Sequence, residues 1–307
     1  MNLSKLTPPL LGLVLTSTTA NAQWEIKTDL EYRDGNRSDI TSYEDDGSFD
    51  KRKVKQKRRV EAETLLTYTQ ETAVPELEYS IRLGHLFKRT HDTDLQFKEN
   101  GDLKKDKTRT EYERYTYAGL GLRYDTGTLL GADRWLLKTR YDRYLHVSYS
   151  ANQLHEDAKS RSGDLTGFEW SVKAEGEYST PSPAFYLHPF VSFKQERLSS
   201  WHEDLRGKAQ EAEQEQQYEA GLYLSWITPI DGWELIAGPY WQRELDAERA
   251  SDETEWVWED DERWIARARL EYEAPYPGFE LEITFEQHLN GGKENQRELN
   301  LELSYEF

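Results

Sequence analysis

A strict alternation of apolar and polar residues constrains the fold of this chain more than any other feature. In the closing stretch ELNLELSYEF, Leu299, Leu301, Leu303, Tyr305 and Phe307 are apolar, and every residue between them is polar. Successive side chains of a β-strand point to opposite faces, so this pattern predicts a strand with one apolar face. The pattern recurs over residues 24–32, 60–68, 77–83, 116–124, 135–149, 168–178, 185–193, 218–226, 233–241, 264–272, 279–285 and 299–307. Each segment is about as long as a tilted membrane-spanning strand of ~9–11 residues.

The connections between these segments alternate in length. QETAVPE, DTGTLLGAD, STPSPA, ITPIDG and EAPYPG are short, whereas DGNRSDITSYEDDGSFDK, KRTHDTDLQFKENGDLKKDKT and the runs near 151–163, 197–214 and 245–262 are long and charged. An even strand number with short turns on one side and long polar loops on the other is typical of outer-membrane barrels. The sequence therefore predicts an all-β fold, a transmembrane antiparallel β-barrel of 12 strands with short periplasmic turns and long extracellular loops. The last strand is expected to pair with WEIKTDLEYR, because an open edge in hydrocarbon costs several kcal/mol per unpaired group.

Aromatic residues flank nearly every short turn on the predicted outward face. The pairs are Tyr68 and Tyr79, Tyr124 and Trp135, Tyr178 and Phe185, Trp226 and Trp233, and Tyr272 and Phe279, with Trp24 and Phe307 at the two chain ends. Amphipathic rings prefer the membrane interface, so this arrangement predicts one aromatic girdle at the periplasmic side. A soluble β-sandwich also alternates, but it has no reason to place rings at every turn on one side.

Composition alone would allow a different class of chain. A formal net charge of −19 and 32% charged residues suggest acidic disorder, but 13% aromatic residues require burial or a membrane.

The first 22 residues, with Lys5, a short apolar run and Ala20-Asn21-Ala22, predict a signal peptide at 1–22 and a barrel over 23–307. Pro189 and Pro239 fall inside predicted strands, where a bulge or a bend is expected, since proline cannot donate to a strand ladder.

The polar residues of the twelve segments should line the interior. Basic residues gather on the second to fifth strands and acidic residues on the eighth to twelfth. The positive set is Lys53, Lys55, Lys57, Arg59, Arg82, Arg123, Lys138, Arg140, His146, Lys173, Lys194, Arg267 and Arg269, and Tyr115, Tyr117, Tyr144, Tyr186 and Tyr240 offer stacking faces. Charges at this density need water or partners. Two interpretations stay open: a polarised channel whose basic wall attracts anions, or a narrow barrel filled by ion pairs.

Several short stretches resemble a known family. LEYRDGNRSD, strands containing HPF and GPY, ARLEYEAPYPGFELEIT and the terminal LELSYEF are similar to the oligogalacturonate-specific porin family. That resemblance implies a small monomeric twelve-stranded channel that passes acidic oligosaccharides along inward arginine and lysine side chains. The residues that would carry this track here are Arg59, Arg82, Arg123, Lys138, Arg140, Arg267 and Arg269. The terminal phenylalanine also resembles the signal read by the barrel-assembly machinery.

Two other classes of function have candidate residues. Outer-membrane phospholipases use a His-x-Ser pair on one strand, and YLHVSYS supplies His146 and Ser148, which are expected to face the lumen and not the lipid. Outer-membrane proteases need acids and a histidine at the rim, for which His91 with Asp92 and Asp94, or His202 with Glu203 and Asp204, could serve. The acidic loops lack the ligand spacing of a defined calcium site. A structural or adhesive barrel would use those loops as its contact surface.

The expected function is passive diffusion of small solutes, first of all acidic oligosaccharides, across the outer membrane. Electrostatic guidance by the inward basic residues would be the mechanism, with Tyr117, Tyr144 and Tyr240 as stacking surfaces along the path. No catalysis, cofactor, metal or nucleic-acid partner is expected. The expected partners are outer-membrane lipid, the barrel-assembly machinery and the solute.

Overall fold

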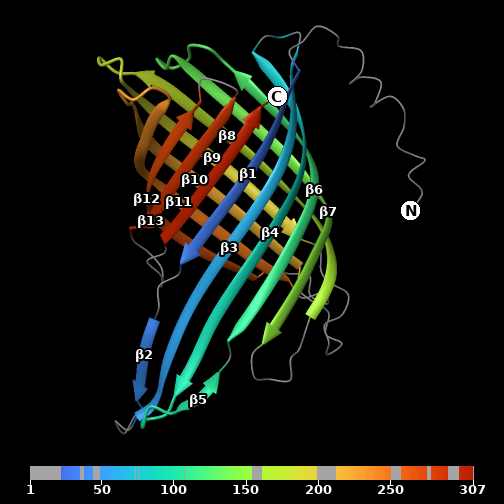
Figure 1. Ribbon diagram of the computed structural model, residues 1–307, viewed down its shortest axis with the longest axis vertical. Coiled ribbons are helices and arrows are strands. Elements are labelled where there is room, and N and C mark those ends of the chain that lie inside the picture. Colours follow the sequence, from blue (N-terminus) through green and yellow to red (C-terminus); the bar gives the residue numbers. More distant parts are fainter. Residues whose placement is uncertain are drawn as a thin grey trace, which may run out of the picture.

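A ring of antiparallel strands forms the molecule (Figure 1). The computed structural model describes residues 22–34, 38–43, 49–72, 74, 76–106, 108–153, 161–198, 212–249, 257–274, 278–289 and 297–306. The strands are β1 (Ala22–Asp34), β2 (Ser38–Tyr43), β3 (Phe49–Glu71), β4 (Leu77–Phe97), β5 (Leu103–Asp106), β6 (Arg109–Asp125), β7 (Arg134–Gln153), β8 (Arg161–Ser179), β9 (Phe185–Leu198), β10 (Ala212–Ile227), β11 (Trp233–Arg249), β12 (Val257–Glu273), β13 (Phe279–His288) and β14 (Arg297–Glu306). The predicted signal peptide lies outside the described residues, except for Ala22 at the start of β1.

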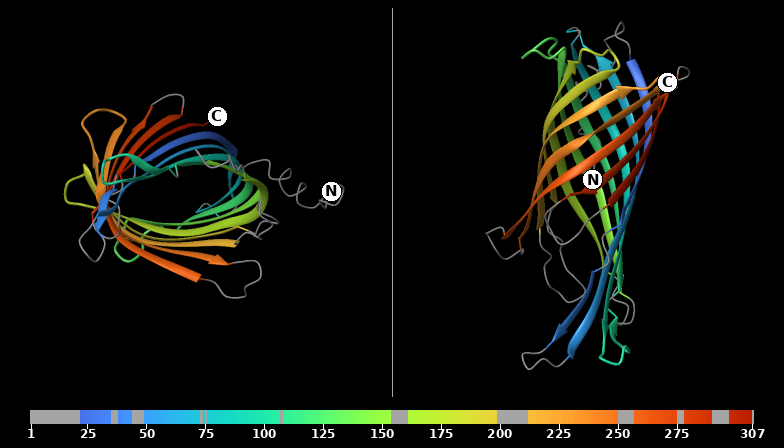
Figure 2. Two further views of the ribbon diagram at one scale, coloured as in Figure 1. Left: turned by 90° about the horizontal axis from the view of Figure 1, so that it is seen from below. Right: turned by 90° about the vertical axis from the view of Figure 1, so that its left-hand side faces the viewer.

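Twelve of these strands close the barrel, as the sequence predicts. β1 pairs with β14 on one side and with β3 on the other, and β3 pairs with β4, so the ring has no free edge. The predicted closure is confirmed, with Leu30 opposite Leu301 and Tyr32 opposite Leu299. The view along the barrel in Figure 2 shows the strands surrounding a central space. We call the end with the short connections the turn end and the other the loop end.

Two predicted loops contain strands. β3 and β4 continue beyond the loop end of their neighbours, and the short strands β2 and β5 pair with their outer edges. Within the stretches 34–51 and 88–108, expected to be irregular and charged, residues 38–43, 49–51, 88–97 and 103–106 therefore form part of a four-stranded sheet. The alternation of apolar and polar residues does not predict these strands, because the many charged residues leave neither face continuously apolar.

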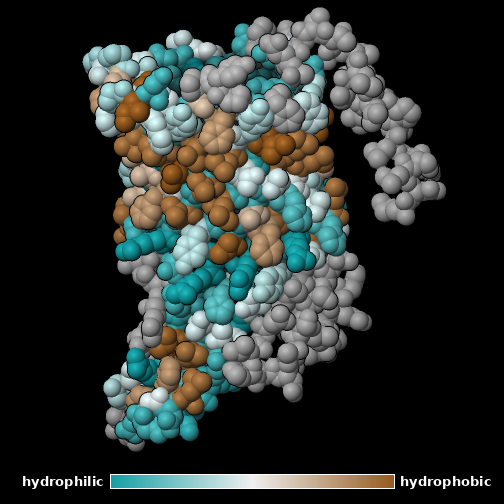
Figure 3. All heavy atoms as spheres, in the orientation of Figure 1, coloured by the Kyte–Doolittle hydropathy of each residue, from teal (hydrophilic) through white to brown (hydrophobic). Residues whose placement is uncertain are grey.

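The outer wall of the barrel is apolar near the turn end. Leu122 and Leu301 point outward and keep 49% and 36% of their surface exposed, whereas Arg140 and Arg267 line an internal cavity. Figure 3 shows a band of hydrophobic residues across the upper half of the visible face. A soluble protein rarely exposes so large a continuous apolar surface. The predicted sidedness, apolar outside and charged inside, is therefore confirmed. No helix in the described part of the chain is long and apolar enough to cross a membrane.

Aromatic rings bound this band on two sides. At the turn end, the rings of Trp24 and Tyr68 lie 4.9 Å apart and those of Phe185 and Trp226 lie 6.3 Å apart, as the predicted girdle requires. A second belt lies further along the strands, where the Phe193 ring is 4.9 Å from both Trp170 and Tyr218. The pairs Tyr178 and Trp170, Phe185 and Phe193, Trp226 and Tyr218, Trp233 and Trp241, and Tyr272 and Trp264 are each eight residues apart. At ~3.3 Å per residue and a tilt of about 40°, this spacing spans about 20 Å along the membrane normal, slightly less than the outer-membrane apolar band of about 25 Å.

A threonine organises three of the short turns. The hydroxyl oxygens of Thr72, Thr180 and Thr228 accept hydrogen bonds from the amides two residues later, at 3.1, 3.3 and 3.3 Å. Hydroxyl side chains stabilise tight turns in this way. Because the turn is short, it holds the paired strands in one register, and that register fixes which side chains meet across the lumen.

The two mid-strand prolines do not produce bulges. Around Pro189, β8 and β9 pair through Glu175 with Phe190 and again through Tyr178 with Leu187, in the same register. Pro239 is flanked in the same way in the pairing of β10 with β11. The ladder is interrupted locally and resumes unshifted. Of the two expected accommodations, the bulge is therefore wrong, because the strand loses local pairing without gaining a residue, and the bend stays a prediction.

A charge on the outer wall distinguishes a barrel in lipid from a barrel in water. Leu222 points outward within the apolar band and is 47% exposed, and Leu130 lies in a turn and is 79% exposed. We expect Leu222→Arg to destabilise the barrel by about 2–4 kcal/mol, because lipid cannot solvate the guanidinium. Leu130→Arg should have little effect. Equal tolerance of both changes, measured by urea unfolding in lipid vesicles, would argue against a membrane environment.

Candidate functional site

The lumen contains two cavities. One, of about 430 Å³, lies toward the loop end, and we call it the upper cavity. The other, of about 470 Å³, lies toward the turn end, and we call it the lower cavity. Figure 1 draws the molecule the other way up, with the loop end at the bottom. All ten residues predicted to line the lumen contribute to these walls. Arg59, Arg267, Arg269, Tyr117, Tyr144 and Tyr240 line the upper cavity, Arg82, Arg123 and Lys138 line the lower, and Arg140 lines both. Their role as a solute path stays a prediction.

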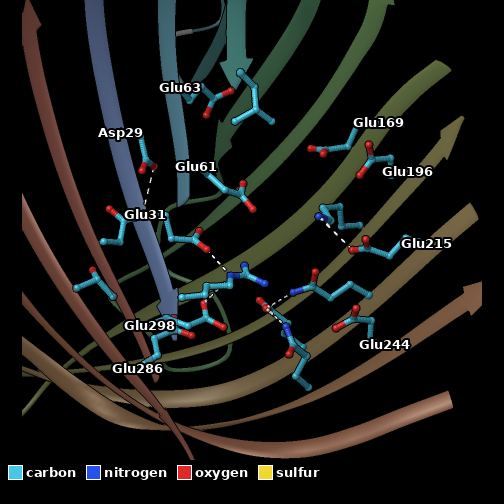
Figure 4. Close-up of a pocket in the computed structure, with 18 of the residues that line it drawn as sticks. Asp29, Glu31, Glu61, Glu63, Glu169, Glu196, Glu215, Glu244, Glu286 and Glu298 are labelled. Carbon is cyan, nitrogen blue, oxygen red and sulfur yellow. Dashed lines mark hydrogen bonds and ion pairs between the residues drawn. The ribbon is translucent and has the colours of Figure 1, made fainter. Parts of the chain in front are cut away.

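Carboxylates outnumber cations in the upper cavity (Figure 4). Its acidic residues are Asp29, Glu31, Glu61, Glu63, Asp142, Glu169, Glu196, Glu215, Glu219, Glu244, Glu282, Glu286 and Glu298. Its basic residues are Arg33, Arg59, Lys88, Arg140, Lys194, Arg263, Arg267 and Arg269. The wall therefore carries more negative than positive charge, which differs from the expected basic track.

Arg82 and Arg140 share one buried carboxylate. Arg82 Nη1 lies 2.8 Å from Oδ2 of Asp142, whose exposure is 3%, and Arg140 Nε lies 3.0 Å from the same oxygen. Arg140 also forms an ion pair with Glu169. Because Arg82 lines the lower cavity, Asp142 the upper and Arg140 both, this cluster lies where the two cavities meet. We call Arg82, Asp142, Arg140 and Glu169 the septum.

Two glycines make room for the septum. A Cβ on Gly119 of β6 would lie 1.8 Å from Oδ1 of Asp142, and one on Gly84 of β4 would lie 2.0 Å from the Tyr117 ring. Arg82 stands over that ring at 6.0 Å from its centroid. Without side chains at these positions, Arg82 on β4 reaches across β6 to Asp142 on β7. The glycines of RLGHLF and YAGLGLRY thus create the space that the ion pairs occupy.

Arg267 organises a second cluster on the opposite wall. Its Nε donates to Glu286 at 2.5 Å and its Nη1 to the Tyr223 hydroxyl at 2.8 Å. The Tyr240 hydroxyl donates to Glu286 at 2.8 Å, and the guanidinium lies 4.7 Å from the Tyr240 ring centroid. Every polar group of this buried cluster has a partner, as buried charges require. Tyr240 is therefore occupied by Arg267 and not free to stack on a solute.

The other predicted cations are also neutralised, with one exception. Arg59 pairs with Glu61, Arg123 with Glu78 at 3.3 Å, and Arg269 with Glu271 at 2.8 Å. Lys138 forms no ion pair with any residue that the structure describes. The predicted tyrosines bind carboxylates, because the Tyr117 hydroxyl donates to Glu63 and that of Tyr144 to Glu196 at 2.8 Å.

Four carboxylates of the upper cavity are held by neutral donors. Asp29 accepts from Asn300 at 3.3 Å, Glu63 from Tyr117, Glu196 from Tyr144, and Glu219 from Ser192 at 2.9 Å. A neutral donor satisfies the carboxylate but leaves its charge uncompensated. These four residues therefore account for most of the negative excess in the cavity.

The sequence also missed three cations of the upper cavity. Arg33 pairs with Glu31 and Glu298, Arg263 pairs with Glu244, and Lys88 lines the wall. All three lie on strand residues beyond the alternating segments. Extending the inward set by steps of two from Glu31 would have found Arg33.

A bulge in β7 overturns the predicted orientation of His146. Thr116 pairs with His146 but Tyr117 pairs with Tyr144, so Leu145 is an extra residue. After the bulge the alternation is inverted. Val147, expected to face lipid, points inward with 1% exposure, and His146 and Ser148 lie on the outer face. A bulge reverses the two faces because it adds one residue to one strand only.

The first protease-like group, His91 with Asp92 and Asp94, does not assemble on one face of the sheet. His91 and Asp92 are adjacent on β4 and therefore point to opposite faces, and the His91 Nδ1 contacts the Thr110 hydroxyl at 3.0 Å. His202, Glu203 and Asp204 lie outside the described residues, as do parts of the acidic loops. Glu215, Glu244 and Asp246 bring carboxylates within 4.8 Å of one another, but Glu215 is paired with Lys194 and Glu244 with Arg263.

No protein-family model and no curated protein sequence matches this chain. The resemblance to oligogalacturonate-specific porins therefore stays a prediction. Solved structures do match. The chain is similar to the translocator domain of autotransporter NalP from Neisseria meningitidis, at 12% identity and TM-score 0.57 over 97% of this chain and 92% of that chain. It is similar to the transport unit of autotransporter AIDA-I from Escherichia coli, at 10% identity and TM-score 0.59 over 94% and 91%. The beta domain of the Bordetella autotransporter BrkA matches at 13% identity and TM-score 0.58 over 93% and 99%. These likenesses show the fold: the chain folds as a bacterial outer-membrane β-barrel.

Proposed function

We propose that this protein is an outer-membrane channel through which small solutes diffuse passively. The observation that carries the proposal is the pair of cavities, of about 430 and 470 Å³, along the inside of a barrel whose outer wall is apolar. A barrel of twelve strands is intermediate between filled eight-stranded barrels and open porins. Its interior is charged, and charged walls need water, which supports a hydrated path.

The charge of the lumen narrows the class of solute. Among the described residues, the cations of the predicted anion track are paired except for Lys138, and four carboxylates are held by neutral donors alone. Walls of one sign attract ions of the opposite sign and repel those of their own. We therefore propose that small cations and neutral solutes pass more readily than polyanions. The acidic oligosaccharides that the family resemblance implies are the competing solute class, and one measurement separates the two.

The septum limits the width of the path. Arg140 lines both cavities, and its guanidinium is held by Asp142 and Glu169 at the place where they meet. Solutes have to pass this ion-pair cluster, so its side chains set the conductance. The septum is a constriction and not a hydrophobic gate, because all four of its members are charged.

Ion selectivity tests the proposed sign of the lumen. In planar bilayers with a salt gradient, the wild-type channel should prefer cations. The variant Glu196→Gln with Glu219→Gln should lose part of that preference, because it removes two uncompensated charges from the upper cavity. The matched control Glu262→Gln removes a carboxylate that binds Trp241 outside the lumen at 2.7 Å and should leave the reversal potential unchanged. Anion preference that falls in Arg140→Ala would support the acidic-oligosaccharide channel instead.

Conductance tests the septum. Arg140→Ala should raise the single-channel conductance, because it shortens a side chain that lines both cavities. Asp142 keeps Arg82 as its partner, and Glu169, which loses its ion pair with Arg140, lines the upper cavity, where water can reach it, so the barrel should stay folded. Arg134→Ala, which removes an arginine paired with Glu177 at the turn end, is the control and should conduct like the wild type. Absence of conductance in all three proteins would favour a filled structural or adhesive barrel.

A lipid hydrolase is the second candidate function. The β7 bulge places His146 and Ser148 on the outer wall, opposite Thr116 and Arg114, which is the side that a lipid substrate would approach. A histidine beside a serine can take its proton as the serine attacks an ester carbonyl. The channel function predicts no release of fatty acid from phospholipid vesicles. Hydrolysis that is lost in Ser148→Ala and kept in Ser80→Ala, a change on the inner face, would establish the enzyme.

A further inference from the structure

A sheet extension stands beyond the loop end of the barrel. β3 and β4 keep one unbroken register from Glu71 opposite Glu78 to Arg52 opposite Phe97. The rings of Phe87 and Tyr112 lie 6.3 Å apart and extend the second aromatic belt to β4 and β6. Phe87 lies opposite Ala62, so the part of β3 before Val60 lies beyond the apolar band. Figures 1 and 2 show this part, with β2 and β5, extending away from the barrel. We call it the extension.

One face of the extension carries a row of lysines. Residues 51–59 read KRKVKQKRR, in which Lys51, Lys53, Lys55, Lys57 and Arg59 occupy alternate positions. Arg59 lines the upper cavity, so these residues continue the lumen wall and not the lipid-facing wall. We call the residues Lys53, Lys55 and Lys57 the lysine row.

The neighbours of the row offset only part of its charge. Across β4, Lys55 lies opposite Asp94, Lys57 opposite Asp92 and Lys53 opposite Gln96, which in turn lies opposite Lys105 of β5. Residues directly opposite each other share a face, so the two aspartates lie beside the row, and the four lysines outnumber them. Within the described part of the chain, no ion pair or hydrogen bond reaches a side chain of the lysine row. Lys51 differs, because it binds Asp50 at 2.8 Å. That hydrogen bond, together with one from Ser42, lowers the pKa of Asp50.

The sign of the inner face of β3 changes at the mouth of the barrel. Arg59 pairs with Glu61, and Glu61 and Glu63 begin the acidic wall of the upper cavity. Most cations inside the barrel are paired, whereas no ion pair with a described residue reaches the lysine row, in a chain whose formal net charge is −19. Like charges at alternate positions repel one another, so the row favours an anion that compensates them.

We propose that the inner face of the extension is a docking surface for a soluble, linear polyanion. Alternate residues of a strand lie about 6.6 Å apart, so the lysine row offers evenly spaced charges along one line. A chain polymer with repeated carboxylate or sulfate groups fits such a line. Because the row continues the lumen wall, it faces away from the lipid side, where membrane headgroups would approach.

The opposite face has a different character. Val54 of β3 is buried there beside Leu95 of β4, and Arg52 lies over the Phe97 ring at 5.9 Å from its centroid. Arg52 and Arg58 are therefore cations of the same strand that point away from the lysine row. They provide a matched control, because replacing them removes the same charge from the same strand.

Binding of fluorescently labelled dextran sulfate to the full-length protein in detergent micelles tests the proposal. The wild-type protein should bind this polymer and not neutral dextran, and binding should weaken as salt screens the charges. Lys55→Gln with Lys57→Gln should weaken binding by about tenfold, as expected for two exposed charge contacts. Arg52→Gln with Arg58→Gln should leave the Kd unchanged.

Three results would overturn the docking surface. They are no binding at low salt, an equal loss in the two double variants, and lysine-dependent binding to lipopolysaccharide vesicles without binding to the soluble polymer. The last would make the row a membrane contact. The test does not depend on the proposed channel, because a barrel that conducts no ions would still bind the polymer.

Discussion

The pairing of β1 with β14 is the interaction on which the rest of the structure depends. Hydrocarbon offers no partner to a backbone N–H or C=O, so a sheet in a membrane is stable only as a closed ring. Closure gives each strand one face toward lipid and one toward the lumen. The alternation of Leu299, Leu301 and Leu303 with polar residues follows from this requirement. The same requirement gathers most charged side chains of the membrane-spanning part in one enclosed space, where each charge needs a partner or water.

The sequence predicts the strands well because the signal is local. Each apolar face is visible in its own segment, and the aromatic residues beside the turns mark one membrane interface. The extension was missed because the residues before Val60 have no apolar face to reveal a strand, yet they pair as regularly as the rest. The second aromatic belt is present in the sequence at the spacing of Trp226 and Tyr218. The second belt is recognised only when its residues are aligned across neighbouring strands. That alignment requires the strand register, which the sequence alone does not provide.

The candidate site is predictable in part, for a related reason. The alternation of apolar and polar residues along each strand is enough to place Arg82, Arg140 and Arg267 inside the barrel. Their partners do not follow from this alternation, since Arg82 and Asp142 are separated by a whole strand and meet only because Gly119 leaves the space open. The alternation of inward and outward residues is also broken by the extra residue Leu145, after which His146 points outward. The alternation within one strand predicts which face a residue points to. It does not predict contacts that depend on the register between strands.

The arginines inside the barrel are paired and the lysines of the extension are not, and this difference has one physical cause. Inside the barrel, walls on every side reduce solvation, so an unpaired arginine would be costly and each finds a carboxylate. Beyond Arg59 the sheet stands in water, where the lysine row is stable without partners. Salt screens these lysines within about 8–10 Å, so they do not govern a small ion that enters on the far side of the mouth. A polymer lying along the row contacts several lysines at once, and the acidic wall that begins at Glu61 opposes its entry. The same strand can therefore hold a polyanion outside a lumen that admits small cations.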